Sequence, residues 1–138
     1  MATQLSPYLS FDGNAREAVA FYGTVFGVEP DVSTYDSQGP VDDPALAKKI
    51  MHSQLLVEGV GTLMASDVPP GTTLVGNPSL ALFGGTEDRE RLHGWFAALS
   101  DGAQEVMAIE TAPWGDEFGI LTDRFGVRWM VNVSPRPA

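Results

Sequence analysis

Apolar residues recur three or four positions apart after Asn14, which is the spacing of one face of an α-helix. The stripe begins at Ala15 and continues to Phe26. Asn14 is a favoured N-cap residue, and Glu17 stands where a capping box places its acidic partner. Gly27 follows the stripe and is a typical helix stop. The pattern therefore predicts an amphipathic helix between Asn14 and Gly27.

A second helical stripe begins at Thr86 and stops before Gly102. The segments that lead into the two helices are alike, because each is an apolar strand that ends in Phe, Gly and a capping residue. Phe11 precedes Phe83 by the same interval that separates the two capping positions. The apolar members of the second stripe are Leu92, Trp95, Phe96 and Leu99.

A second likeness follows each helix. Residues 52–64 and residues 117–129 both have the pattern of a strand, a turn and a second strand. Glu58 and Asp123 close the first strands, and a glycine opens each second strand. Both segments are therefore predicted to be β-hairpins.

Strands near residues 28–36 and 103–109 complete two halves with the same order of strand, helix and three strands. Two helices cannot cover eight strands on both faces, so one face of each sheet must meet something else. We predict an α+β fold in which two βαβββ modules form a curved mixed sheet around a cavity. The chain is then one domain with a first module at about 1–68, a linker at about 69–77 and a second module at about 78–134.

The composition limits the possible partners and sites. A chain of 138 residues with 43% hydrophobic residues suits one globular domain. The absence of cysteine excludes disulfides and thiolate sites, and it fits a cytoplasmic location. The net charge of −10 argues against nucleic acids and anionic membranes. An acidic surface could attract a cationic ligand, although solubility is the simpler reason for such a charge.

Several segments, in the same order along nearly the whole chain, carry a likeness to a known family. They are residues 7–18 with Phe21 and Tyr22, then 49–52, 63–67, 114–119, 123–127 and 129–132. In these segments the chain resembles PhnB-like proteins, a branch of the vicinal-oxygen-chelate or glyoxalase/bleomycin-resistance superfamily. The resemblance implies two βαβββ modules around a U-shaped cavity, and it implies a homodimer.

Functions in that superfamily are diverse. They include glyoxalases, extradiol dioxygenases, epimerases, thiol transferases and proteins that sequester bleomycin without a metal. Some relatives carry the name demethylubiquinone methyltransferase, but the chain lacks the glycine-rich strand–turn–helix expected for S-adenosylmethionine. The fold alone therefore does not predict the activity.

Metal-using members of the superfamily place His, Glu or Gln at four strand positions, where an ion with open coordination sites can chelate a substrate. The positions that correspond here fall near Pro7, at Ala65, near Ser79 and at Met130. None of these residues is a usual metal ligand. The resemblance therefore predicts no metal ion and no cofactor.

The remaining candidate for chemistry is His52. Alternation along its strand places His52 and Gln54 on one face, and it places Ser53, Leu55 and Val57 on the other face, against the helix. A histidine on the open face could act as an acid or base or hold a ligand. Alternatively, it is a structural histidine with a hydrogen bond across the sheet.

Trp114 follows a proline in a loop and could either line a ligand pocket or fill a dimer interface. The predicted ligand-binding residues are His52, Gln54, Asp67, Trp114 and Met130, and His52 is the candidate catalytic residue.

Three functional hypotheses follow from these observations. The first is a metal-free PhnB-like protein that binds a small molecule. The second is an enzyme of the lyase, dioxygenase or transferase type with a rearranged site around His52, in which Gln54, Asp67 or Glu110 is a candidate helper. The third is a structural homodimer without an open cavity.

Overall fold

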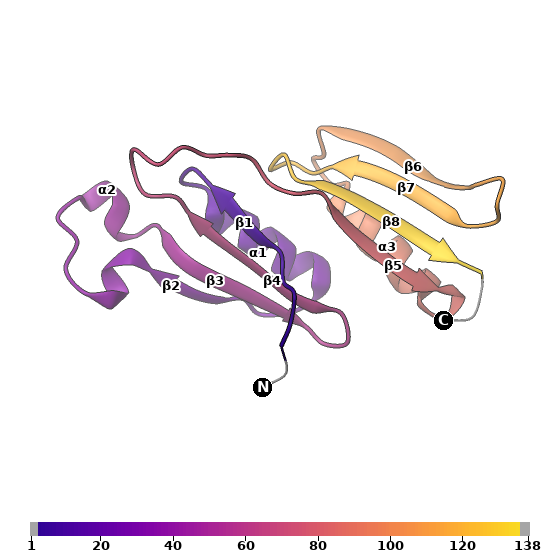
Figure 1. The fold of residues 1–138 in the computed structure, drawn as a ribbon, viewed down its shortest axis with the longest axis horizontal. Coiled ribbons are helices and arrows are strands. Elements are labelled where there is room, and N and C mark those ends of the chain that lie inside the picture. The colour runs from indigo at the N-terminus through magenta and orange to yellow at the C-terminus, as the bar shows by residue number, and fades with distance from the viewer. Residues whose placement is uncertain (1–2, 136–138) are drawn as a thin grey trace. The chain divides into compact units, whose positions relative to one another are not determined.

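The computed structural model describes residues 3–135 and contains two compact units that meet in the sequence between Asn77 and Pro78. Each unit is a four-stranded mixed sheet with a helix packed on one face (Figure 1). The predicted α+β fold with two βαβββ modules is confirmed. The organisation of the whole chain as one domain stays a prediction.

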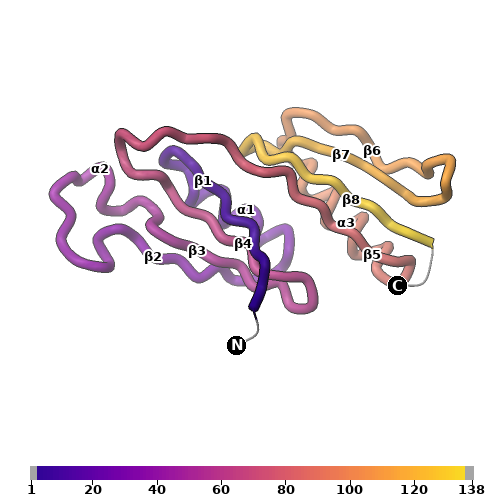
Figure 2. The backbone as a smooth tube through the Cα atoms, viewed as in Figure 1, coloured from indigo at the N-terminus to yellow at the C-terminus, as the bar shows by residue number. Residues whose placement is uncertain are grey.

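The first unit has the strand order β1-β4-β3-β2. Strands β1 and β4 are parallel, and the other pairs are antiparallel. The tube in Figure 2 shows β1 entering the sheet beside β4, the last strand of the unit. The elements are β1 (Tyr8–Phe11), α1 (Ala15–Phe26), β2 (Asp31–Thr34), the 3₁₀ helix η1 (Tyr35–Gln38), α2 (Pro44–Ala47), β3 (Ile50–Val57) and β4 (Gly61–Asp67).

The second unit repeats this topology with the strand order β5-β8-β7-β6. Its helix starts later than predicted, because residues from Thr86 first form a 3₁₀ turn, a common start for a helix. The elements are β5 (Leu80–Gly85), η2 (Thr86–Asp88), α3 (Arg89–Leu99), β6 (Glu105–Thr111), β7 (Glu117–Thr122) and β8 (Arg128–Ser134).

Helix α1 covers one face of the first sheet and buries the apolar stripe predicted for it. Tyr22 is fully buried on the helix, and Leu55 on β3 is 1% exposed. The neighbours Ser53 and Val57 are also buried, whereas Leu56 is 60% exposed. The predicted alternation on β3 is therefore confirmed. The face with His52 and Gln54 is the one that α1 does not cover.

Asp67, the last residue of β4, holds three segments of the first unit together. Its side chain is buried, and Oδ1 accepts the backbone N–H groups of Gly13 and Ala15, both at 2.9 Å. Its Oδ2 accepts the backbone N–H of Ile50, also at 2.9 Å. Asn14 occupies the N-cap position of α1 without a side-chain capping bond, so the predicted capping box is wrong. The cap comes instead from Asp67, which is distant in sequence.

Asp123 has a similar role in the hairpin between β7 and β8. The carboxylate is fully buried, and Oδ1 accepts the backbone N–H groups of Phe125 and Val127. Oδ2 accepts the indole N–H of Trp129 at 2.9 Å. The acidic residue that was predicted to close the strand thus fixes the turn and the first residues of β8. Its counterpart Glu58 is exposed.

The outer edge of β1 is paired with a side chain. Oδ1 of Asn77 accepts the backbone N–H of Ser10 at 2.8 Å, and its Nδ2 donates to the Ser10 carbonyl oxygen at 3.1 Å. The end of the predicted linker therefore packs with the first unit. Within residues 3–135, no helix is both long and apolar enough to span a membrane.

Candidate functional site

The open face of the first sheet carries polar side chains from all four strands. Four residues lie directly opposite one another in a row across the sheet, because strand pairing aligns Asp31 with Gln54, Gln54 with Met64 and Met64 with Tyr8. Directly paired residues point to the same face. The next row begins with Ser33 opposite His52. The predicted pair of His52 and Gln54 is thus surrounded by hydroxyl, amide and carboxylate groups.

His52 forms hydrogen bonds through both ring nitrogens. Its Nδ1 lies 3.2 Å from the Tyr8 hydroxyl, and its Nε2 lies 3.4 Å from Oε1 of Gln54. An amide oxygen can only accept, so in the neutral ring Nε2 carries the proton and Nδ1 accepts from the tyrosine. The rings of Tyr8 and His52 are also in tilted contact, with centroids 5.7 Å apart. Tyr8 and Gln54 together hold the imidazole in a fixed orientation.

Tyr35, at the start of η1, belongs to the same neighbourhood. Its hydroxyl donates to the backbone carbonyl oxygen of Asp67 at 2.6 Å. Burial raises the pKa of the Tyr35 phenol, and the Asp67 carboxylate and Tyr8 raise it further. The phenol therefore stays neutral at physiological pH and keeps its role as a hydrogen-bond donor to the sheet.

The other predicted site residues lie elsewhere. Asp67 is 2% exposed, and its carboxylate accepts from three backbone N–H groups, which leaves little of it accessible to a ligand. Trp114 lies in the connection between β6 and β7 and is 68% exposed. Met130 lies on β8 between Ala81 of β5 and Ile120 of β7 and is half-buried.

The open face of the second sheet exposes several large apolar side chains. Met130 lies at its centre, and strand pairing places Phe83 opposite Asn132 on the same face. Phe83 is 71% exposed and Met107 is 65% exposed. A pocket of about 280 Å³ lies beside Met107, Ile120 and Arg128. The two open faces therefore differ in degree, since the second exposes more large apolar side chains, although it also carries Glu105, Thr122, Arg128 and Asn132.

The side chains present do not fit the metal centre of metal-using relatives. Among residues 3–135, no three His, Asp or Glu side chains gather closely enough to hold an ion. Ala65, which the resemblance placed at a ligand position, is 2% exposed and pairs with Ser53 on the helix-covered face. The neighbouring open-face positions on β4 hold Met64 and Ser66.

A charged cluster in the second unit was not predicted. Arg89 on α3 forms a two-pronged hydrogen bond to Glu117 on β7, at 2.7 Å and 3.0 Å. His93 also contacts this carboxylate, at 3.0 Å through Nε2. The hydrogen bond from Arg89 is the main reason that the pKa of Glu117 is lowered, and the bond from His93 adds to it. The cluster ties α3 to the sheet on an accessible part of the surface.

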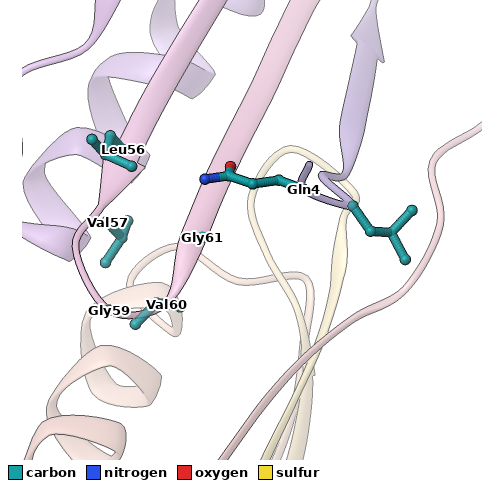
Figure 3. Close-up of a pocket in the computed structure, with 7 residues that line it drawn as sticks. Gln4, Leu56, Val57, Gly59, Val60 and Gly61 are labelled. Carbon is teal, nitrogen blue, oxygen red and sulfur yellow. The ribbon is translucent and has the colours of Figure 1, made fainter. Parts of the chain in front are cut away.

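A pocket of about 380 Å³ lies at the turn between β3 and β4 (Figure 3). Gln4 reaches it from the N-terminal segment, and Thr62 donates a hydrogen bond to the Gln4 side chain at 3.1 Å. Leu56 and Val60 line it and are both exposed. Among the residues that line the pocket, only Gln4 has a polar side chain, so the lining offers no side chain for acid–base chemistry.

Comparison with known proteins identifies the relatives of this chain. Residues 3–132 match the model of the 3-demethylubiquinone-9 3-methyltransferase family. The protein YjdN of Escherichia coli is 30% identical, and the match covers 94% of each chain. The structure is similar to that of protein PA1353 from Pseudomonas aeruginosa, at 34% identity and a TM-score of 0.79, over 96% of this chain and 98% of the other.

A protein from Bacillus cereus described as a putative 3-demethylubiquinone-9 3-methyltransferase, PhnB protein, is 25% identical with a TM-score of 0.67, over 96% of this chain and 100% of the other. A bleomycin-binding protein and a bleomycin resistance determinant, each 17% identical with TM-scores of 0.56 and 0.54, share the fold. The glyoxalase/bleomycin-resistance proteins among the similar structures show the fold, and the chain belongs to the PhnB-like, or 3-demethylubiquinone-9 3-methyltransferase-like, family.

Proposed function

We propose that this protein binds a small molecule on the open face of the first sheet, around His52 and Gln54, without a metal ion. The observation that carries the proposal is the hydrogen-bonded chain from Tyr8 through His52 to Gln54. It holds polar groups in fixed positions on a face that α1 leaves uncovered, which is how binding sites gain specificity. Within residues 3–135, no three His, Asp or Glu side chains lie together as a metal site would need, which supports binding without a metal ion.

Two substitutions on β3 test this proposal. Leu55→Ala should lower the free energy of unfolding by about 2–5 kcal/mol, because it removes buried methyl groups and leaves a cavity. His52→Ala should cost about 1 kcal/mol or less, since its two hydrogen bonds lie on an accessible face. Thermal melting of both variants, together with a ligand screen on wild type and His52→Ala, gives the comparison.

The ligand screen separates a binding site from a scaffold. Compounds that stabilise the wild type should lose affinity by a factor of about 5–100 in His52→Ala, which corresponds to roughly 1–3 kcal/mol for a hydrogen bond lost in a desolvated site. The proposal fails if His52→Ala destabilises the fold as strongly as Leu55→Ala and leaves every affinity unchanged. His52 would then be a structural histidine.

An enzyme of the lyase, dioxygenase or transferase type is the second candidate. The specific observation in its favour is the contact between the Tyr8 phenol and the His52 imidazole, two groups that can exchange a proton with a ligand. In this mechanism the Tyr8 hydroxyl takes a proton from the ligand and passes its own to Nδ1 of His52, the base, while Gln54 positions the ring. Elemental analysis of protein purified without chelator separates the two candidates, because a bound transition metal would favour the enzyme.

We also propose that the protein is a cytoplasmic homodimer with no nucleic-acid partner. The exposed apolar side chains on the open face of the second sheet, such as Phe83 and Met107, support an interface, since large exposed apolar patches on soluble proteins mark sites of association. The interface should bury at least roughly 1,000 Å² in total. Light scattering at micromolar concentration should give twice the mass of the 138-residue chain. A monomer at that concentration would contradict the dimer and favour neither binding candidate.

A further inference from the structure

Asp31, Gln54, Met64 and Tyr8 form a row that crosses the whole first sheet. Three of the four carry a hydrogen-bond acceptor oxygen, and Met64 carries a thioether. Paired residues of neighbouring strands have Cβ atoms about 4.5–5.5 Å apart, so one small ligand can touch several members of the row at once. We name these four residues the cross-strand row. Its chemistry indicates the class of ligand.

Asp31 supplies a negative charge at one end of the cross-strand row. It is exposed and, within residues 3–135, forms no ion pair. The cations of the first unit are engaged away from the row. Lys48 pairs with Asp36, Lys49 donates to the Gly13 carbonyl oxygen, and Arg16 donates to the Lys48 carbonyl oxygen.

The other members of the row add acceptors and polarisable surface. The Tyr8 hydroxyl donates its proton to His52, so its oxygen can still accept a hydrogen bond from a ligand. Tyr8 is 44% exposed, and its aromatic ring can contact a cation. Gln54 keeps a second lone pair on the oxygen that accepts from His52. Met64 lies between Tyr8 and Gln54 and contributes a thioether.

We propose that the cross-strand row binds an organic cation that donates hydrogen bonds, such as an ammonium, amidinium or guanidinium group. Asp31 supplies the countercharge, Tyr8 and Gln54 accept its N–H groups, and His52 holds Tyr8 and Gln54 in place. The net charge of −10 draws such a cation toward the protein in general. This inference rests on the proposed binding function and narrows it to one ligand class.

Three planar probes of matched shape test the charge preference: benzamidinium, neutral benzamide and benzoate. Each is titrated into isotope-labelled full-length protein, and NMR shifts are followed at the His52 ring nitrogens, the Gln54 side-chain amide and the backbone of β1 and β3. Benzamidinium should cause saturable shifts at these positions, whereas benzoate should cause none. Asp31→Asn should weaken benzamidinium binding about two- to fivefold, the range of one exposed ion pair.

Asp42→Asn is the matched control, since it removes the same charge from an exposed residue outside the row. An equal loss of affinity in both variants would overturn the inference, because it would show attraction by net charge alone. Absence of benzamidinium shifts at the row would also overturn it. Benzoate or benzamide binding at His52 and Gln54, without benzamidinium, would reject the cation and leave the proposed binding function standing.

Discussion

Replacing Asp67 by alanine should lower the free energy of unfolding by about 3–6 kcal/mol, or prevent folding. The substitution leaves three backbone N–H groups without their acceptor, those of Gly13, Ala15 and Ile50. An unsatisfied buried donor costs about 1–3 kcal/mol, and total stabilities of small domains are only about 5–15 kcal/mol. Urea unfolding followed by circular dichroism measures the change.

Asp67→Asn provides a measurable variant if the alanine variant does not fold. The amide oxygen can still accept from Gly13 and Ala15, while the NH₂ group then faces the N–H of Ile50. Its cost should be about half that of alanine. Asp42→Ala, on an exposed loop, should stay within about 0.5 kcal/mol of wild type. Equal unfolding midpoints for Asp67→Ala and wild type would show that water replaces the carboxylate without cost.

Replacing Asp123 by alanine should have a similarly large effect, about 3–5 kcal/mol, because two backbone N–H groups and the Trp129 indole N–H lose their acceptor. A double-mutant cycle can isolate the indole bond. Asp123→Asn turns an NH₂ group toward the indole N–H, so two donors oppose each other. The same change in a Trp129→Phe background removes this conflict and should cost less, by about 0.5–3 kcal/mol.

Guanidinium unfolding of the four proteins in the cycle gives the coupling free energy. Strict additivity of Asp123→Asn and Trp129→Phe would mean that the indole bond contributes nothing beyond the backbone contacts. Glu58→Ala is the control from the first unit, because Glu58 holds the corresponding hairpin position but is exposed. It should leave the unfolding midpoint nearly unchanged.

Local patterns predicted much of the fold because local forces determine them. Helix α1 begins and ends where the apolar stripe and Gly27 indicate, and Gly27 adopts the left-handed conformation that only glycine takes without strain. The period of two on β3 correctly separated Leu55 from His52, because a strand with one covered face must alternate.

The roles of Asp67 and Asp123 could not be predicted in the same way. Asp67 was interpreted as a ligand-binding residue, but its partners are backbone groups of segments that lie far away in the sequence. A sequence shows which residue can accept a hydrogen bond and does not show which N–H will be left unpaired nearby. The expected capping by Asn14 failed for this reason.

The partner of His52 was also missed. Tyr8 lies two strands away from β3 in the sheet, so its contact depends on the order β1-β4-β3. One signal was available, since the resemblance placed the first-strand site position near Pro7, which Tyr8 follows directly. A phenol at that position and an imidazole on an open face are compatible with a direct hydrogen bond once the strand order is known.

The hydrogen bonds of Asn77 to the edge of β1 determine where the chain can be truncated to give a well-behaved first unit. Unpaired groups at the edge of a sheet let another chain add as a further strand. Asn77 uses both backbone groups of Ser10 on that edge and so blocks such addition there. A fragment that stops at residue 68 would expose a self-complementary edge, whereas one that stops after Asn77 keeps its own protection against fibre-like association.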